Sequence, residues 1–448
     1  MKKNHHKIHV LAAVAMSICY LPAAYADTSS EPKTLTLSGF GTFGIVKTNN
    51  ELVEFRSYAQ APNGTANRWE MENESRLGLQ LAYSPNESFR GVVQLLSRRN
   101  ERSVGEKSNF YPAVDWAYVA YSPSKSLNLR AGRFVAPAFL ASESRAVGYA
   151  NVWIRPPVDL YAAANINNID GVDLLYRGSL FGWTYAAQTY AGSYNLKFAT
   201  QRIKYEYMAG ANLTVENGPF LLRLGYMDAR STTYNKADQI LPTSLATRRT
   251  DGTSAGTLNP TTTNCLSQRV SCSTLFENYN EVLDFMKRDK KPMNLATIGY
   301  TYDDGEWYSQ GEYLYRKGGG SLANSESAYL TVGYRFGKFL PHLTVSKANP
   351  QDQRIELKVA PAFEANLRRS PFGRDLPLGV VTSNAAQESI GLGVRYDVAT
   401  NIALKIQWDH MRPKATANAP SFGLALSPTN GVPGKAVTVT AIALDFVF

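Results

Sequence analysis

The chain ends with the stretch Val437–Phe448, VTVTAIALDFVF, which decides the fold. Counted back from the terminus, every second residue from Phe448 to Ile442 is aromatic or aliphatic, whereas Asp445 and the two alanines before it on the other face are small or polar. Such a strand suits a membrane barrel, because its outer side meets lipid and its inner side meets a watery lumen. A half-buried strand of a soluble sandwich has the same pattern, so the rest of the chain must distinguish the two.

The opposite end of the chain indicates export. Residues 1–26 carry three lysines, then an apolar run from Val10 to Leu21 and a small-residue site that ends at Ala26. This order is typical of a secretory signal peptide, and the run is too short for a membrane helix, which takes about 20 residues. We predict a signal peptide at 1–26 and a mature domain at 27–448, which has no apolar run long enough for a membrane helix.

The charge of the mature chain gives no reason to expect nucleic acid as a partner. Removal of the signal peptide lowers the formal net charge from +10 to +7, and the basic residues are scattered singly. A nucleic-acid-binding protein usually gathers them into a patch or block.

Cys265 and Cys272 are the only cysteines of the mature chain, and they lie in a segment rich in Ser and Thr. Two close cysteines in a secreted protein favour one local disulfide that stabilises a loop. A metal site is the alternative, but His342 and His410, the remaining histidines, are far from the pair in sequence. The sequence predicts neither a metal nor a cofactor.

Period-two alternation divides the mature chain into sixteen predicted strands. They are Leu35–Ile45, Glu74–Ala82, Ser88–Arg98, Val114–Tyr121, Ser126–Phe134, Gly171–Gly178, Phe181–Ala191, Tyr205–Val215, Phe220–Asp228, Asn294–Tyr302, Glu306–Arg316, Ala328–Phe336, Pro341–Lys347, Glu388–Asp397, Asn401–Met411 and Ala436–Phe448. Short turns rich in Pro, Asn, Asp and Gly alternate with long connections, notably 46–73, 135–170, 229–293, 346–387 and 412–435. Short turns on one rim, long loops on the other and an even strand number predict a closed antiparallel transmembrane β-barrel.

The inward faces of these strands carry charges. In the strand that begins at Glu388, Arg395 and Asp397 share the polar face, opposite an aliphatic one. Burying such charges in a dry core is costly, whereas a watery lumen hydrates them. Sixteen strands leave an aqueous channel of this kind.

The alternation, the loop asymmetry and the terminal Phe448 together resemble the sixteen-stranded porins of Gram-negative outer membranes. This resemblance implies a homotrimer that contacts outer-membrane lipids and lipopolysaccharide and passes small hydrophilic solutes by passive diffusion. It also implies that barrel-assembly machinery reads Phe448 as an assembly signal. Finally, it implies that the third external loop folds into the lumen as a constriction.

The corresponding loop here is 135–170, where Pro137 and the Pro156-Pro157 pair argue against strands. In general porins this loop carries acids that face arginines on the early strands. The matching positions are Glu143 and Asp159 on the loop and Arg76, Arg90, Arg98 and Arg130 on the wall. This loop also carries Arg145 and Arg155, which departs from the family's pattern. One interpretation is that these two arginines pair with Glu143 and Asp159 and merely hold the loop.

The other interpretation is a weak to moderate preference for anions. By alternation, basic residues outnumber acidic residues on the inward faces. The basic set is Arg76, Arg90, Arg98, Arg130, Arg177, Arg223, Arg316, Arg335, Arg395 and Lys405, and the acidic set is Glu74, Asp115, Asp173, Glu206, Glu312, Asp397 and Asp409. A lumen dominated by positive charge concentrates anions.

Three further hypotheses concern other functions. Gly39–Gly44 matches a dinucleotide-binding pattern, but it lies within a predicted strand rather than before a helix. A barrel hydrolase would need an activated nucleophile, usually with a histidine base. Alternation places His410 on the outward face, and His342 has no evident acidic partner in sequence. A channel specific for one substrate, such as an organic or phosphate-like anion, is the nearer alternative.

Overall fold

The computed structural model describes residues 34–58, 61, 64–99, 110–164, 166–197, 201–235, 245–248, 254–259, 264–320, 323–351, 354–369, 378–381, 386–414, 426–428 and 436–448. The predicted signal peptide at 1–26 lies outside them.

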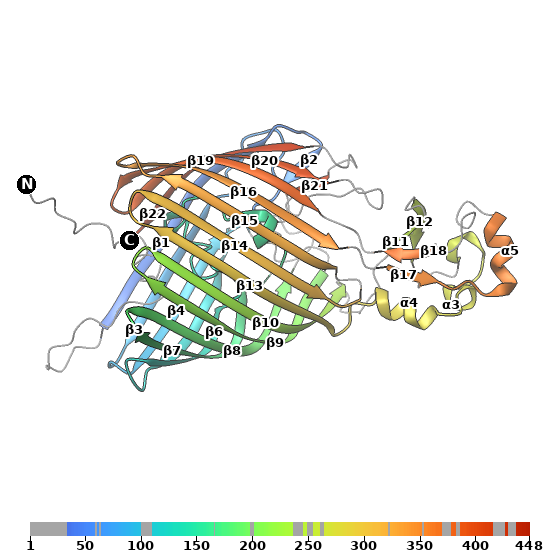
Figure 1. Cartoon of the computed structure of the whole chain (residues 1–448), viewed down its shortest axis with the longest axis horizontal. Helices are drawn as coiled ribbons and strands as arrows, with labels where there is room; N and C mark the ends of the chain where they lie inside the picture. Colours follow the sequence, from blue (N-terminus) through green and yellow to red (C-terminus); the bar gives the residue numbers. More distant parts are fainter. Residues whose placement is uncertain are drawn as a thin grey trace, which may run out of the picture.

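Sixteen antiparallel strands form one closed barrel, as the alternation predicts (Figure 1). They are β1 (Thr34–Thr48), β3 (Arg76–Ser84), β4 (Phe89–Arg98), β5 (Pro112–Tyr121), β6 (Leu127–Val135), β7 (Asn168–Leu180), β8 (Trp183–Lys197), β9 (Gln201–Asn217), β10 (Phe220–Asn235), β13 (Lys291–Asp303), β14 (Trp307–Gly318), β15 (Asn324–Tyr334), β16 (Phe339–Gln351), β19 (Gln387–Ala399), β20 (Ile402–Pro413) and β22 (Val437–Val447). Each predicted stretch falls on one of these strands, so the prediction of the fold is confirmed. The largest differences in length are at β9, β10 and β16, which are six or seven residues longer than predicted.

Connections at one rim of the barrel are short. For example, β9 and β10 are joined by two residues, one of which is Gly218 at φ +56°, a left-handed conformation that favours glycine. Most connections at the other rim are longer, although β8 and β9 are joined there by three residues. The first and last of them meet there, because β2 (Val53–Phe55) pairs with β21 (Leu426–Pro428).

The barrel closes where β22 pairs with β1, and the terminal aromatics lie at this seam. The backbones of Gly39 and Phe448 exchange two hydrogen bonds of 2.9 Å. A Cβ atom on Gly39 would lie 2.4 Å from Cζ of Phe448, and one on Gly41 would lie 2.3 Å from Cζ of Phe446. Gly39 and Gly41 therefore leave room for aromatic rings on the outer face of a strand, a different role from phosphate binding.

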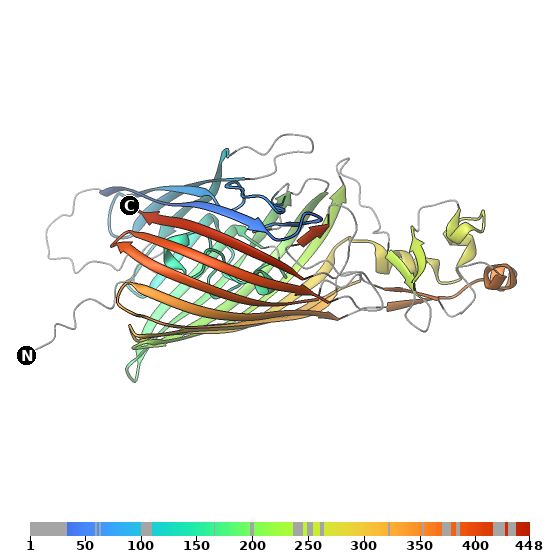
Figure 2. The ribbon, with the colours of Figure 1, turned by 90° about the horizontal axis from the view of Figure 1, so that it is seen from above.

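Two of the long connections form a small unit that extends beyond the rim at which the long connections lie (Figure 2). Its sheet has the order β12 (Ser254–Leu258), β11 (Leu245–Arg248), β18 (Leu378–Val381) and β17 (Arg354–Leu357). Its helices are η2 (Cys265–Ser267), α3 (Cys272–Leu275), α4 (Tyr279–Met286) and α5 (Pro361–Arg369). Leu275, Val282 and Leu367 belong to its buried core, and a disulfide joins Cys265 to Cys272. We call it the external unit.

Among the residues described here, no helix has the length and apolarity needed to cross a membrane.

Candidate functional site

The connection between β6 and β7, residues 136–167, enters the barrel, and we call it the lumen loop. Its helical turns η1 (Gly148–Ala150) and α2 (Val158–Tyr161) lie inside the ribbon of the barrel in Figure 2. Phe139, Trp153 and Leu160 are fully buried between the loop and the wall. Apolar side chains from the loop itself thus supply the packing that an ordered loop of this length needs.

The lumen loop docks on the later strands of the barrel. Trp153 donates from Nε1 to the hydroxyl oxygens of Thr331 and Thr344, at 2.9 and 3.2 Å. Glu312 accepts bonds of 2.8 Å from the backbone nitrogen of Leu140 and 2.9 Å from the hydroxyl of Tyr161. These hydrogen bonds hold the loop against β14, β15 and β16.

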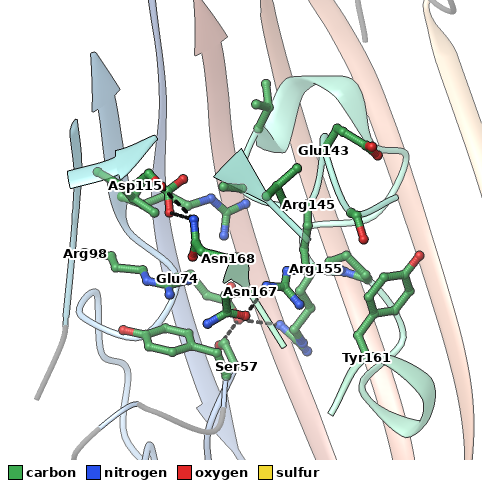
Figure 3. A pocket seen from close by; sticks show the side chains of 18 of the residues that line it. Ser57, Glu74, Arg98, Asp115, Glu143, Arg145, Arg155, Tyr161, Asn167 and Asn168 are labelled. Atoms are coloured by element: carbon green, nitrogen blue, oxygen red, sulfur yellow. Dashed lines mark hydrogen bonds and ion pairs between the residues drawn. The ribbon is translucent and has the colours of Figure 1, made fainter. Parts of the chain in front are cut away.

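A pocket lies between the lumen loop and the early strands β3 to β5, and we call it the opening (Figure 3). Arg98 and Asp115 face it from the wall, and Glu143 and Arg145 face it from the loop. The residues that line it include Tyr58, Glu74, Arg76, Gln94, Arg98, Asp115, Glu143, Arg145, Arg155, Asn167 and Asn168.

Arg155 lies at the centre of a buried charge cluster. It donates to Glu74 Oε1 at 2.6 Å and also to Asp409, and its guanidinium lies 4.6 Å from the ring centroid of Phe55. Two carboxylates therefore share one guanidinium, and burial makes each of these contacts strong. Glu143 pairs instead with Arg223 on β10, at 3.3 Å.

The interpretation that Arg145 and Arg155 pair with Glu143 and Asp159 is wrong. Arg155 uses Glu74 and Asp409, as above, and Arg145 donates to the amide oxygen of Asn167. Asp159 is fully buried, and it accepts hydrogen bonds from Ser346 and Gln387 on the far wall. Burial raises the pKa of Asp159.

Two further arginines of the opening, Arg76 and Arg98, each contact a neutral group. Arg76 donates to the carbonyl of Ile154 at 3.3 Å, and the guanidinium of Arg98 lies 4.5 Å from the ring centroid of Tyr58. Burial, with the nearby charge of Arg98, lowers the pKa of Arg145 to about 10, so Arg145 stays charged at neutral pH. The structure thus gathers the guanidinium groups of Arg76, Arg98 and Arg145, in addition to that of Arg155, around one space.

Asp115 is the main acid on the wall of the opening. It accepts a 3.1 Å bond from the amide of Gln94 and a 3.3 Å bond from the amide of Asn168. Alternation placed Asp115 inward, but nothing in the sequence gives its depth along the barrel or its distance from the loop.

Five of the eight predicted constriction residues line the opening, namely Arg76, Arg98, Glu143, Arg145 and Arg155. The other three, Arg90, Arg130 and Asp159, are not among the residues that line it. Arg130 forms a bidentate pair with Asp173 beneath the rings of Tyr118 and Phe134. Its placement at the constriction is therefore wrong, because a cross-strand acid and two aromatic rings cover it.

Several predicted lumen cations are also bound rather than hydrated. Arg395 and Lys405 are 2% and 1% exposed, because the lumen loop covers them. Arg335 pairs with Asp303 at 3.0 Å, and Arg316 donates to carbonyl oxygens of Ala163 and Ala323. The simple count of inward charges therefore overstates the positive charge that a solute meets.

The sequence model of the Gram-negative porin family matches residues 11–340 of this chain. An anion-selective porin from Comamonas acidovorans has a similar structure at 13% identity and a TM-score of 0.51, with 93% of this chain and 100% of that chain covered. OmpF of Salmonella typhi in complex with daunomycin has 13% identity and a TM-score of 0.51, with 93% and 98% covered. OmpT of Vibrio cholerae has 8% identity and a TM-score of 0.50, with 94% and 99% covered. No curated protein matches the chain.

A closed sixteen-stranded barrel with a loop inside it defines the class of outer-membrane channels. The chain belongs to the Gram-negative porin family, because the sequence model of that family matches most of the chain. It is an outer-membrane protein that forms a channel for the diffusion of solutes.

Proposed function

We propose that this channel passes small hydrophilic solutes and prefers anions weakly. One observation carries the proposal: Arg76, Arg98 and Arg145 gather at the opening, and Asp115 is the acid that faces them. The other acids of the opening are engaged, because Glu74 is paired with Arg155 and Glu143 with Arg223.

The preference should be weak because the excess charge is small. Arg155 holds two carboxylates, so the cluster of Arg155, Glu74 and Asp409 has a net negative charge that offsets part of the arginine charge. Salt at 0.1 M also limits the reach of a charge to about 10 Å. A solute therefore responds to these arginines only while it is inside the opening.

Swelling of liposomes that contain the purified protein tests this proposal. Three solutes of similar size, one anionic, one neutral and one cationic, are compared at low salt. We expect the anion to enter fastest, the neutral solute next and the cation slowest. Equal rates, or faster entry of the cation, would contradict the proposed preference.

A channel specific for one substrate is the second candidate. The same arginine group would then bind a carboxylate or phosphate strongly enough to saturate, because paired guanidinium–anion contacts are strong and directional. Flux that rises linearly with anion concentration supports general diffusion, and flux that reaches a plateau supports the specific channel.

A hydrolase remains the competing class, and the surroundings of the histidines give it little support. The His342 ring hydrogen-bonds the carbonyl of Leu340, and the His410 ring hydrogen-bonds the hydroxyl of Thr438. Neither described histidine contacts a carboxylate in these bonds. An esterase assay of the purified protein and of His342→Ala would detect any hydrolase activity that depends on His342.

We also propose a homotrimer in contact with lipid and lipopolysaccharide, assembled by the barrel-assembly machinery. Membership of the porin family supports this, and so does the broad apolar outer face, on which Leu35, Leu37 and Phe43 are exposed. Crosslinking of the protein in isolated outer membranes tests the trimer, and a monomer alone would count against it.

A further inference from the structure

Lys405 on β20 and Arg395 on β19 lie beneath the tip of the lumen loop, on the wall away from the opening. Both are almost fully buried, although the alternation pattern would make them free lumen cations. A buried cation is costly unless other groups satisfy its charge and its donors. The partners of these two side chains show what they do.

Lys405 binds the backbone of the loop directly. Its Nζ donates to the carbonyl oxygens of Gly148 at 2.7 Å, Asn151 at 2.6 Å and Trp153 at 2.9 Å. These three bonds use the three donors of an ammonium group. A 2.8 Å ion pair with Asp445 on β22 supplies the opposite charge.

Arg395 binds the same turn from the next strand. Its Nη1 donates to the carbonyl oxygens of Tyr149 at 2.6 Å and Asn151 at 3.0 Å, and its guanidinium lies 4.8 Å from the ring centroid of Tyr149. Its Nε donates to Asp397 at 2.8 Å. Lys405 and Arg395 thus donate five hydrogen bonds in all to backbone carbonyl oxygens of residues 148–153.

The contact also depends on the closed barrel. Asp445 accepts a 2.5 Å bond from the hydroxyl of Thr42 on β1, directly across the seam. A Cβ atom on Gly148 would lie 1.9 Å from Asp445 Oδ1, so the loop approaches this carboxylate as closely as a glycine allows. The tip of the loop therefore rests on the seam itself.

We propose that Lys405 and Arg395 are positioning residues that fix the lumen loop on the seam and thereby set the opening on the other side. They bind residues 148–153, and this segment separates Arg145 from Arg155, which both line the opening. Movement of the segment moves both arginines relative to β3 to β5. The inference rests on the channel function but not on the anion preference.

The test is single-channel recording of Lys405→Met, which removes the donors and keeps most of the side-chain volume. Hydrogen bonds to a charged group stabilise the docked conformation of the loop. Their loss should therefore raise the frequency of sub-conductance events about tenfold or more. Lys405→Arg, which keeps charge and donors, should restore much of the quiet current. The matched control is Lys338→Met, because Lys338 is exposed and donates to the carbonyl of Val398 at 3.1 Å rather than to the loop.

The opposite outcome is a quiet Lys405→Met channel of wild-type conductance whose reversal potential shifts toward cations. That result would show that Lys405 acts as a lumen charge, and it would overturn the inference. If Lys405→Met does not migrate as a folded, heat-modifiable barrel, Arg395→Gln replaces it with the same expectation. A quiet Arg395→Gln channel would then contradict the proposal in the same way.

Discussion

Among single residues, Arg145 offers the most direct test of the proposed selectivity. It lies on the lumen loop, faces the opening and contacts an amide rather than a carboxylate. Replacing it with Gln removes one positive charge and leaves no buried acid without a partner. We expect Arg145→Gln to reduce the permeability ratio of anion to cation by up to a few-fold, measured from the reversal potential.

Arg90→Gln is the matched control for this prediction. Arg90 is also an inward arginine of an early strand, but it is not among the residues that line the opening. The ratio should stay at the wild-type value in this variant. An equal fall in both variants would mean that the whole lumen, rather than the opening, selects ions.

Alternation in the sequence predicted which side chains point inward but not what they contact. Arg76, Arg98 and Arg145 line one space, and strand order together with the loop's family role is the information in the sequence that places them in one neighbourhood. Asp159 was misplaced, because the loop turns its helical segment against β16 and β19 and buries the carboxylate there. Such contacts join residues far apart in sequence, and no periodic pattern records them.

The seam between β1 and β22 leads to a prediction at the scale of the element. Deleting Phe448, or changing it to Ser, should lower outer-membrane assembly far more than it alters the channel, because the terminal aromatic completes the pairing with Gly39. Gly39→Ala should weaken the same seam by about 1 kcal/mol or more, because the added methyl group displaces the Phe448 ring. The measurement is the yield of heat-modifiable barrel in isolated outer membranes.

Gly91→Ala on β4 is the control for the seam. A Cβ atom there meets nothing within 4 Å, so the yield should not fall. Normal yield from the Phe448 deletion would refute the role of the terminal residue, and normal yield from Gly39→Ala would refute the steric account.

The external unit supports a second prediction at this scale. Loss of the Cys265–Cys272 disulfide, in the double Ser variant, should destabilise the unit by about 2 kcal/mol because the closed loop is short. The barrel should keep its fold and its conductance. Limited proteolysis would reveal faster cleavage in the unit, and mass spectrometry of protein from an oxidising compartment should show no free thiols in the wild type.

The barrel strands and the external unit differ in how well the sequence predicts them. Barrel strands have 9 to 17 residues with one face toward lipid, so the alternation with period two is strong. The strands of the external unit have four or five residues, and its sheet pairs β11 with β18 from a different long loop. Short strands and distant partners leave no periodic signal, which is why this unit was not predicted.

At the scale of the whole molecule, one loop divides the roles of the charges inside the barrel. Cations on the later strands, such as Lys405 and Arg395, hold the loop's backbone, and arginines on the early strands and the loop face the opening. Selectivity should therefore depend on the second group and stability of the loop on the first. A solute experiences a smaller positive charge than the composition of the inward faces suggests.

The sharpest test of the proposed selectivity is the reversal potential of the wild-type channel in a planar bilayer under a salt gradient. We predict a modest excess of anion permeability that lessens as the salt concentration on both sides rises, because screening shortens the reach of Arg76, Arg98 and Arg145. Cation selectivity of the wild-type channel would show that these arginines do not determine which ions pass.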